Sequence, residues 1–148
     1  MKPLSIDQIK DLFHEHGLRT TRQRELIYTL LHQSHDHPTA EELFQAARVQ
    51  DSGLSLATVY NTLDVLVESR LARKLTPAGG GSSRFDADLS DHAHLATTDG
   101  KFVDIPEDLS RELVDRIGPD LVGRIESRMG VKVDAVTVSL VVAGLPGH

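Results

Sequence analysis

Apolar side chains recur every three or four residues through Leu54–Leu71, and this spacing predicts an amphipathic helix. Ser55 stands just before its first turn, where the hydroxyl can accept a backbone N–H and cap the helix. The expected inward positions are Leu56, Val59, Leu63, Leu66 and Val67. The opposite face near the start carries small or polar residues that leave room for a groove: Ala57, Thr58 and Asn61. Tyr60 lies on the flank, where its hydroxyl can reach a phosphate.

The residues after this helix predict two short strands joined by a glycine-rich turn. Leu71–Leu75 and Ser82–Phe85 have strand character, and Thr76–Gly81 lies between them. A helix followed by such a hairpin is typical of a winged helix–turn–helix, whose second helix enters the major groove while the wing contacts the DNA backbone. An ordinary helix and hairpin of any α+β domain would give the same pattern, so this stretch alone leaves both interpretations open.

Three more helices are expected upstream, at the spacing that a winged helix requires. Each begins at a hydroxyl residue that can accept a first-turn N–H, and these residues are Ser5, Thr21 and Thr39. Ser5 with Gln8, and Thr39 with Glu42, have the spacing of a capping box. The first helix is expected to end at His16 and the second at about Ser34, and residues 50–53 form the turn after the third.

The pattern changes near residues 87–91, where we place a domain boundary. His92–Ala96 alternates, a turn follows at Thr97–Gly100, and Lys101–Ile105 returns, which predicts a β-hairpin. If the turn is a three-residue loop with Gly100 in the left-handed conformation, Asp104 falls opposite position 94.

The last third of the chain predicts helices followed by a strand. Helical periodicity runs through Glu107–Met129, and Gly118-Pro119 divides it, with the proline starting a second helix. Gly130 ends that helix. Val131–Ala143 is dense in β-branched residues, which favours a strand buried in a sheet or at a subunit interface.

Composition narrows the possible chemistry. The chain has no cysteine, which excludes disulfides, thiolate zinc sites and cysteine nucleophiles, so any metal must be held by imidazole and oxygen ligands. No run approaches the ~18 apolar residues of a membrane helix. The first ten residues lack the apolar core of a secretion signal, so we expect a cytoplasmic protein without a membrane segment.

A net charge of −6 at first disfavours a nucleic-acid partner. The excess acid, however, lies entirely in the second half: residues 1–85 hold ten basic and ten acidic side chains, and residues 86–148 hold six and twelve. The first half can therefore still present a basic face. Arg22 and Arg24 occupy the first turn of a helix, where cations oppose the helix dipole; solvation is the simpler explanation, and a phosphate partner is the alternative.

Two histidines on the predicted hairpin are candidate metal ligands. His92 and His94 are two residues apart on a strand, so both point to one face, and the expected register would add Asp104. Taken alone, a His-x-His pair is more often two exposed histidines than a metal site. Asp86 ends the predicted wing, and His37 lies far away in the sequence between two helices.

Five blocks taken together resemble the ferric uptake regulator (Fur) family in their order: HPTAEELF (37–44), SLATVYNTL (55–63), SSRFD (82–86), SDHAH (90–94) and GKFVDI (100–105). The resemblance covers about residues 10–143 and is greatest to the peroxide-stress regulators. It implies a metal-dependent homodimeric repressor that binds double-stranded operator DNA and is not an enzyme. The implied fold is α+β, with a winged-helix DNA-binding domain at 1–87, a hinge at 88–91 and a dimerisation and metal-sensing domain at 92–148.

The resemblance also implies a ligand set of three imidazoles and two carboxylates, which maps onto His37, Asp86, His92, His94 and Asp104. Such a set suits Fe²⁺ or Mn²⁺, although affinity order alone does not exclude zinc, nickel or cobalt. Asp104 favours peroxide sensing, because iron sensors of the family typically carry glutamate there. Asn61 does so too, because iron regulators usually place arginine there. The implied DNA contacts are Arg22, Ser55, Ala57, Thr58, Tyr60, Asn61 and Arg84.

The chain departs from the family at the structural zinc site. Typical members hold this zinc with two Cys-x-x-Cys pairs, one of which would fall within residues 96–99 and the other after Gly144. Because neither pair is present, we expect no structural zinc, and dimer stability would rest on apolar packing of Val131–Ala143 and the preceding helices.

The expected mechanism is a metal clamp. One ion bound by His37 and by the hairpin ligands would fix the angle between the domains, and with Fe²⁺ bound, peroxide would oxidise His37 or His92 and release DNA. Alternatives are an iron, manganese or zinc homeostasis repressor without peroxide sensing, a metalloenzyme, and a metal-independent regulator. Four further histidines are expected to be solvated: His14, His16, His32 and His35. Because His32 and His35 lie near His37 in the sequence, an accessory metal site there is the alternative.

Overall fold

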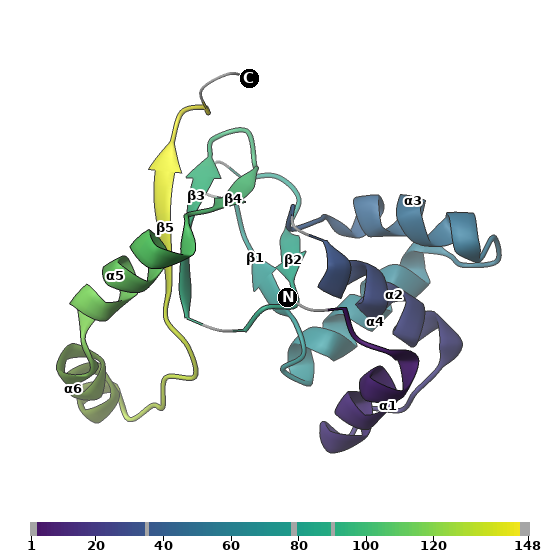
Figure 1. Ribbon diagram of the computed structural model, residues 1–148, viewed down its shortest axis with the longest axis horizontal. Coiled ribbons are helices and arrows are strands. Elements are labelled where there is room, and N and C mark those ends of the chain that lie inside the picture. Colours follow the sequence, from purple (N-terminus) through teal and green to yellow (C-terminus); the bar gives the residue numbers. More distant parts are fainter. Residues whose placement is uncertain (1–2, 35, 78–79, 90, 146–148) are drawn as a thin grey trace. The chain divides into compact units, whose positions relative to one another are not determined.

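A computed structural model describes residues 3–34, 36–77, 80–89 and 91–145. The chain forms two compact units, Met1–Leu89 and Ser90–His148. Figure 1 shows their elements, which in chain order are α1 (Ile6–Glu15), α2 (Arg22–Gln33), α3 (Ala40–Gln50), α4 (Leu56–Glu68), β1 (Arg73–Leu75), β2 (Arg84–Asp86), β3 (His92–Thr97), β4 (Phe102–Asp104), α5 (Glu107–Ile117), α6 (Pro119–Met129) and β5 (Thr137–Val142). Four helices with a two-stranded wing, followed by a small sheet with two helices, confirm the predicted α+β class.

The helices of the first unit begin where the cap residues predict. Ser5 accepts the backbone N–H of Gln8, whose side chain returns to the backbone of Ser5, and this completes a capping box. The other three caps, Thr21, Thr39 and Ser55, each accept the backbone N–H three residues ahead. None of the helices in the described part of the chain combines the length and apolar character needed to cross a bilayer.

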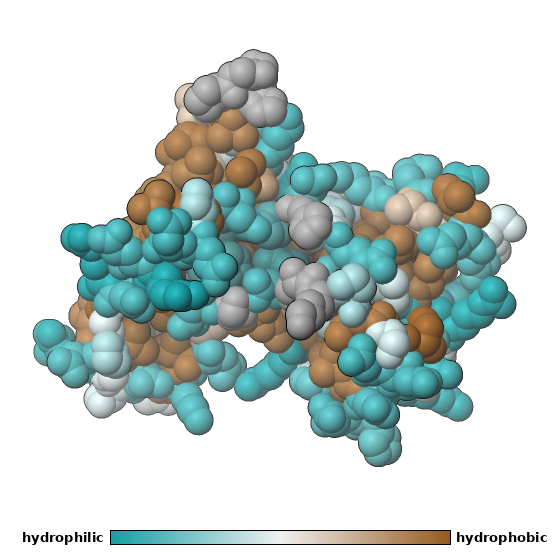
Figure 2. Space-filling view, in the orientation of Figure 1, coloured by the Kyte–Doolittle hydropathy of each residue, from teal (hydrophilic) through white to brown (hydrophobic). Residues whose placement is uncertain are grey.

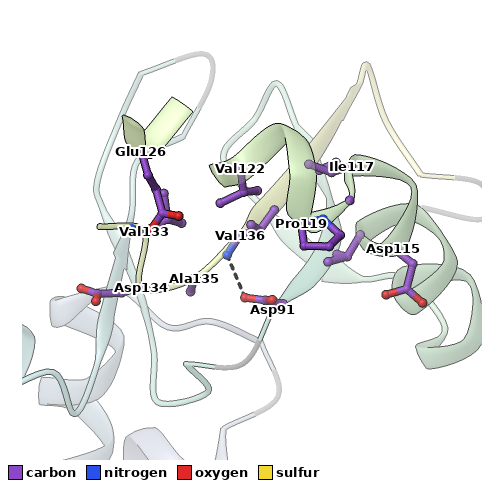
Figure 3. Close-up of a pocket in the computed structure, with 12 residues that line it drawn as sticks. Asp91, Asp115, Ile117, Pro119, Val122, Glu126, Val133, Asp134, Ala135 and Val136 are labelled. Carbon is purple, nitrogen blue, oxygen red and sulfur yellow. Dashed lines mark hydrogen bonds between the residues drawn. The ribbon is translucent and has the colours of Figure 1, made fainter. Parts of the chain in front are cut away.

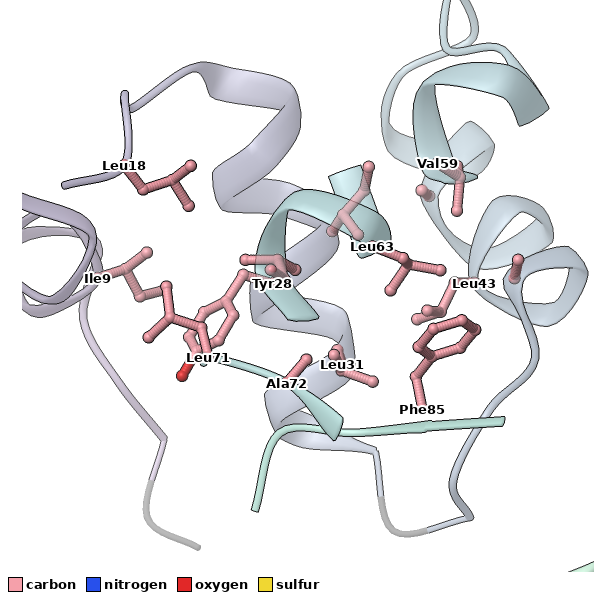
Figure 4. Close-up of a cluster of buried hydrophobic side chains, with 14 of the residues drawn as sticks. Ile9, Leu18, Tyr28, Leu31, Leu43, Val59, Leu63, Leu71, Ala72 and Phe85 are labelled. Atoms are coloured by element: carbon pink, nitrogen blue, oxygen red, sulfur yellow. The ribbon is translucent and has the colours of Figure 1, made fainter. Parts of the chain in front are cut away.

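The core of the first unit joins all four helices to the wing (Figure 4). Ile9 of α1, Leu31 of α2 and Leu63 of α4 are among its most deeply buried side chains. Phe85 projects from β2 into the same cluster. Burial of an aliphatic or aromatic side chain of this size contributes about 1.5–3 kcal/mol, so Phe85 anchors the wing to the helices.

The wing is a two-stranded antiparallel hairpin that also pairs with the segment before α3. Leu75 lies opposite Arg84 in the hairpin. On its other side, Arg84 forms an isolated bridge with Thr39, and the backbone N–H of Phe85 donates to the carbonyl of Pro38 at 2.9 Å. The residues that lead into α3 are therefore fixed against β2. Part of the predicted glycine-rich turn, residues 78–79, lies outside the described residues.

The second unit is a three-stranded sheet in the order β4-β3-β5, with β3 antiparallel to β4 and parallel to β5. Helix α5 packs on this sheet, where the hydroxyl of Ser110 accepts the backbone N–H of Ala93 at 2.7 Å. Gly118 (φ +74°) separates α5 from α6, and Pro119 is the first residue of α6, which confirms the predicted division.

The final strand is shorter and more exposed than its composition suggests. It begins at Thr137 rather than at Val131. Two backbone N–H groups in the preceding residues bond to carboxylates instead of to a strand: Val133 donates to Glu126 at 2.9 Å and Val136 to Asp91 at 2.8 Å. The expectation of a strand buried in the chain's own sheet is therefore wrong, since β5 is an edge strand on which Leu140 and Val141 are 45% and 57% exposed.

Candidate metal ligands and nucleic-acid interface

Two of the five predicted metal ligands meet within the first unit. Nδ1 of His37 lies 3.4 Å from Oδ2 of Asp86, and the two side chains are only 5% and 9% exposed. His37 comes just before α3, and Asp86 is the last residue of β2. His37 has φ +50°, a left-handed conformation that costs a non-glycine residue roughly 1–3 kcal/mol unless its surroundings impose it. Such strain is common at functional positions.

Arg84, predicted to contact DNA, is engaged inside this unit. Its Nη1 donates to the carbonyl oxygen of His37 at 3.1 Å and lies 3.3 Å from Oε1 of Glu42. Its side chain is 17% exposed. The guanidinium is therefore directed toward the residues that surround His37.

The hairpin of the second unit carries the other three predicted ligands. His92 and His94 share one face of β3, and Asp104 of β4 lies opposite His94, which confirms the predicted register. Gly100 has φ +93°, and Thr97 donates its backbone N–H to the carbonyl of Lys101 at 2.9 Å, so a three-residue turn closes the hairpin as expected.

The ring of His94 is held from two sides. Its Nε2 lies 2.8 Å from the hydroxyl of Ser139 on the neighbouring strand β5, and its ring meets that of Phe102 at a centroid distance of 4.9 Å. His94 is 1% exposed, whereas Asp104 is exposed. Sequence reasoning missed Ser139, because the parallel pairing of β3 with β5 leaves no signal in local periodicity.

The donor atoms fit a divalent metal, although they are not gathered around one point within a unit. Among the described residues, no group of three or more histidine or carboxylate side chains stands close enough together to hold an ion. The first unit offers a nitrogen and an oxygen donor, and the second offers two nitrogens and an oxygen. Imidazole and carboxylate donors suit divalent metals that include iron, manganese and zinc.

Helix α4 presents the predicted polar face to solvent. Ser55, Ala57 and Asn61 are exposed, and Thr58 is half-buried with its hydroxyl 2.9 Å from that of Ser55. The hydroxyl of Tyr60 donates to the carboxylate of Glu41 in α3. This hydrogen bond raises the pKa of Tyr60 and lowers that of Glu41. Arg22 is also exposed, in the first turn of α2.

Comparison with known proteins identifies the family. A family model described as the ferric uptake regulator family matches residues 15–119. The chain belongs to the ferric uptake regulator family. The matched residues include His37, Asp86, His92, His94 and Asp104, as well as the whole of α4. Members of this family are transcriptional regulators, so the chain is not an enzyme.

Individual relatives of this Fur-family chain include peroxide regulators. The peroxide-responsive repressor PerR of Staphylococcus saprophyticus is 40% identical over 99 residues, which is 66% of this chain and 66% of that protein. The match thus spans just under two thirds of the relative's length.

Solved structures of the family share the fold. The ferric uptake regulator of Pseudomonas aeruginosa with manganese superposes with a TM-score of 0.70 at 23% identity, covering 91% of this chain and 96% of that one. The Campylobacter jejuni peroxide stress regulator gives a TM-score of 0.66 at 21% identity, covering 98% and 99% of the two chains. At these identities the likeness concerns the fold.

The other histidines of this Fur-family chain differ in environment. His14 and His16 are exposed, as expected. His32 is buried in α2 with its ring tilted against Tyr28, at a centroid distance of 5.9 Å, so the expectation that it is solvated is wrong. Desolvation lowers its pKa. His35 lies outside the described residues.

A pocket of about 380 Å³ opens between α5, α6 and residues 133–136 of the second unit (Figure 3). Its walls combine apolar side chains such as Val122 and Val136 with carboxylates such as Asp115. Among the described residues that line it, none is a predicted metal ligand. The pocket therefore gives no support to a metalloenzyme built on the histidine and aspartate set.

Proposed function

We propose that this chain is a metal-dependent, homodimeric repressor that binds operator DNA when metallated and responds to peroxide through bound iron. The observation that carries the proposal is the occurrence of a partial nitrogen and oxygen ligand set in each unit: His37 with Asp86 in one, and His92, His94 and Asp104 in the other. In this proposal a single ion held by both sets would link the two units.

The proposed DNA-reading surface is the exposed face of α4 together with Arg22. Asn61 can form a bidentate contact with adenine, Tyr60 can contact a phosphate, and Ser55, Ala57 and Thr58 allow close approach to the groove. The partner is double-stranded operator DNA, and such a repressor acts in the cytoplasm. Arg84 is treated separately below, because its guanidinium is engaged within the protein.

The proposed homodimer uses apolar surface of the second unit. Figure 2 shows such surface along β5 and over α6. Its large exposed side chains include Leu121, Ile125, Met129, Leu140 and Val141. Because the chain has no cysteine, we propose that this surface, rather than a thiolate-bound structural zinc, holds the dimer together.

In the proposed switch, metal binding and the oxidation of metal ligands control DNA binding. The five ligands would hold one Fe²⁺ or Mn²⁺ and so restrict the angle between the units, which would keep two recognition helices at half-site spacing. Iron, when bound, would supply the redox chemistry with peroxide. His37 and His92 would be the residues oxidised, and an oxidised imidazole is a weaker donor.

The test is fluorescence anisotropy on the DNA of the protein's own promoter. Protein without metal, with Mn²⁺, and with Fe²⁺ under anaerobic conditions is titrated before and after peroxide. Tight binding with either metal, abolished by peroxide only in the iron form, is expected. Equal affinity for the DNA with and without metal would refute the repressor mechanism. Metal-dependent binding that survives peroxide would instead support an iron, manganese or zinc homeostasis repressor without peroxide sensing.

A further inference from the structure

Arg84 has surroundings that a phosphate-binding wing residue would not need. One nitrogen, Nη1, serves both the carbonyl oxygen of His37 at 3.1 Å and the carboxylate of Glu42 at 3.3 Å. The ion pair with Glu42 neutralises the charge that a phosphate would use, and the side chain is mostly buried. Arginine donors are well suited to such shared, fixed contacts.

Glu42 in turn is fixed by the start of α3. Its carboxylate accepts the hydroxyl of Thr39 at 3.2 Å, and its backbone N–H donates to the same hydroxyl oxygen at 3.2 Å. In the expected capping box the carboxylate would return to the backbone of Thr39; here it accepts from the hydroxyl of Thr39 and from Arg84. The helix cap, the carboxylate and the guanidinium thus form one connected network.

This network acts directly on the conformation of His37. The direction of a carbonyl group depends on the ψ angle of its own residue, so the bond from Arg84 restrains the backbone of His37 in its left-handed conformation. The next residue, Pro38, is also held, because its carbonyl accepts the N–H of Phe85. Since the backbone sets the direction of Cβ, these bonds keep the imidazole beside Asp86.

We propose that Arg84 is a positioning residue for the metal ligands His37 and Asp86, with Glu42 orienting its guanidinium, and that it is not a phosphate contact. The inference rests on the proposed function, because it assumes that these ligands bind metal. Outer groups that orient metal ligands typically change metal affinity by 10–100-fold when they are removed.

The experiment measures two affinities of the full chain: Mn²⁺ binding by isothermal titration calorimetry, and operator binding by anisotropy at saturating Mn²⁺ over a range of salt concentrations. Arg84→Met keeps the aliphatic stem and removes the donors. Lys74→Met is the matched control, because it removes an exposed cation from the same wing. We expect Arg84→Met to weaken Mn²⁺ binding at least about tenfold, with operator affinity at saturating Mn²⁺ and its salt dependence unchanged.

The opposite pattern would overturn the inference. If Arg84 contacts a phosphate, Arg84→Met keeps the wild-type Mn²⁺ affinity, loses operator affinity at saturating Mn²⁺, and loses about one unit of the salt slope. Lys74→Met is expected to keep the wild-type Mn²⁺ affinity; if it weakens Mn²⁺ binding as much as Arg84→Met does, the effect is one of charge and the inference fails.

A second variant covers the case in which Arg84→Met does not fold. Glu42→Gln leaves Arg84 in place and removes the charge that orients it, and it is expected to weaken Mn²⁺ binding severalfold; unchanged Mn²⁺ affinity would refute the network. The two proposals can be refuted separately. If the wild-type protein binds the operator equally well with and without Mn²⁺, the proposed function is refuted. If wild-type binding depends on Mn²⁺ but Arg84→Met has the wild-type Mn²⁺ affinity, only the positioning role is refuted.

Discussion

His32 is a titratable ring in an environment that favours its neutral form. It is buried on α2 against Tyr28, and desolvation lowers its pKa. A histidine in an unfolded chain has a pKa of about 6.5, so the unfolded state takes up this proton before the folded state does. The group therefore costs no stability above that pH and destabilises the fold as pH falls below it.

We expect His32→Gln to reduce the loss of unfolding free energy between pH 7.5 and pH 5.5, because the variant has no ring to protonate. Urea denaturation at the two pH values measures this difference. His14→Gln, at an exposed position of α1, is the control and should keep the wild-type pH dependence. Identical pH dependence in His32→Gln and wild type would show that the burial of His32 has no energetic consequence.

Under the proposed contact of Tyr60 with a phosphate, Glu41 would compete with DNA for the hydroxyl proton of Tyr60, since the hydroxyl has one proton to donate. Its negative charge would also lie beside the phosphates that the proposed surface contacts. Glu41→Gln is therefore expected to bind operator DNA a few-fold more tightly at saturating Mn²⁺, by anisotropy. Glu68→Gln, at the other end of α4, controls for net charge. An equal gain in both variants would rule out a specific role for the Tyr60 contact.

At the scale of elements, the sequence predicts those features that are determined by residues close together in the chain. The caps at Ser5 and Ser55 and the break before Pro119 follow from local backbone chemistry, and the hairpin register follows from the turn at Gly100. The features that were not predicted depend on distant partners. The start of β5 is decided by carboxylates elsewhere in the chain, and the engagement of Arg84 is decided by the loop before α3.

Besides its backbone pairing with the segment before α3, the wing is attached to the helices through the buried ring of Phe85. Phe85→Ala should lower the unfolding free energy by about 3–5 kcal/mol, the usual loss for a fully buried phenylalanine. Phe44→Ala, at a half-buried position on α3, is the matched comparison and should cost less. Chemical denaturation of both variants tests this. Equal losses would mean that Phe85 does not anchor the wing.

At the scale of the whole molecule, a single shared ion makes a prediction that two separate sites do not. Mn²⁺ at one hundred times its dissociation constant should stabilise the folded chain by about 2.7 kcal/mol. His37→Ala and His92→Ala, although they lie in different units, should each abolish most of that gain. Thermal denaturation with and without Mn²⁺ measures it, and His14→Ala should retain the full gain. If each ligand variant kept half, the units would bind metal independently.

The parallel pairing of β3 with β5 also has a consequence for the order in which the two units fold. His94 acquires its Ser139 neighbour from a strand 45 residues later, whereas the helices of the first unit pack largely against their neighbours in the sequence. Contacts between residues far apart in the sequence form slowly, because the entropy of closing a long loop is lost before the contact stabilises the chain. During synthesis the first unit can therefore fold while the second still lacks its edge strand. The sheet that holds the His92 and His94 hairpin would then be completed last, after α4 already exists.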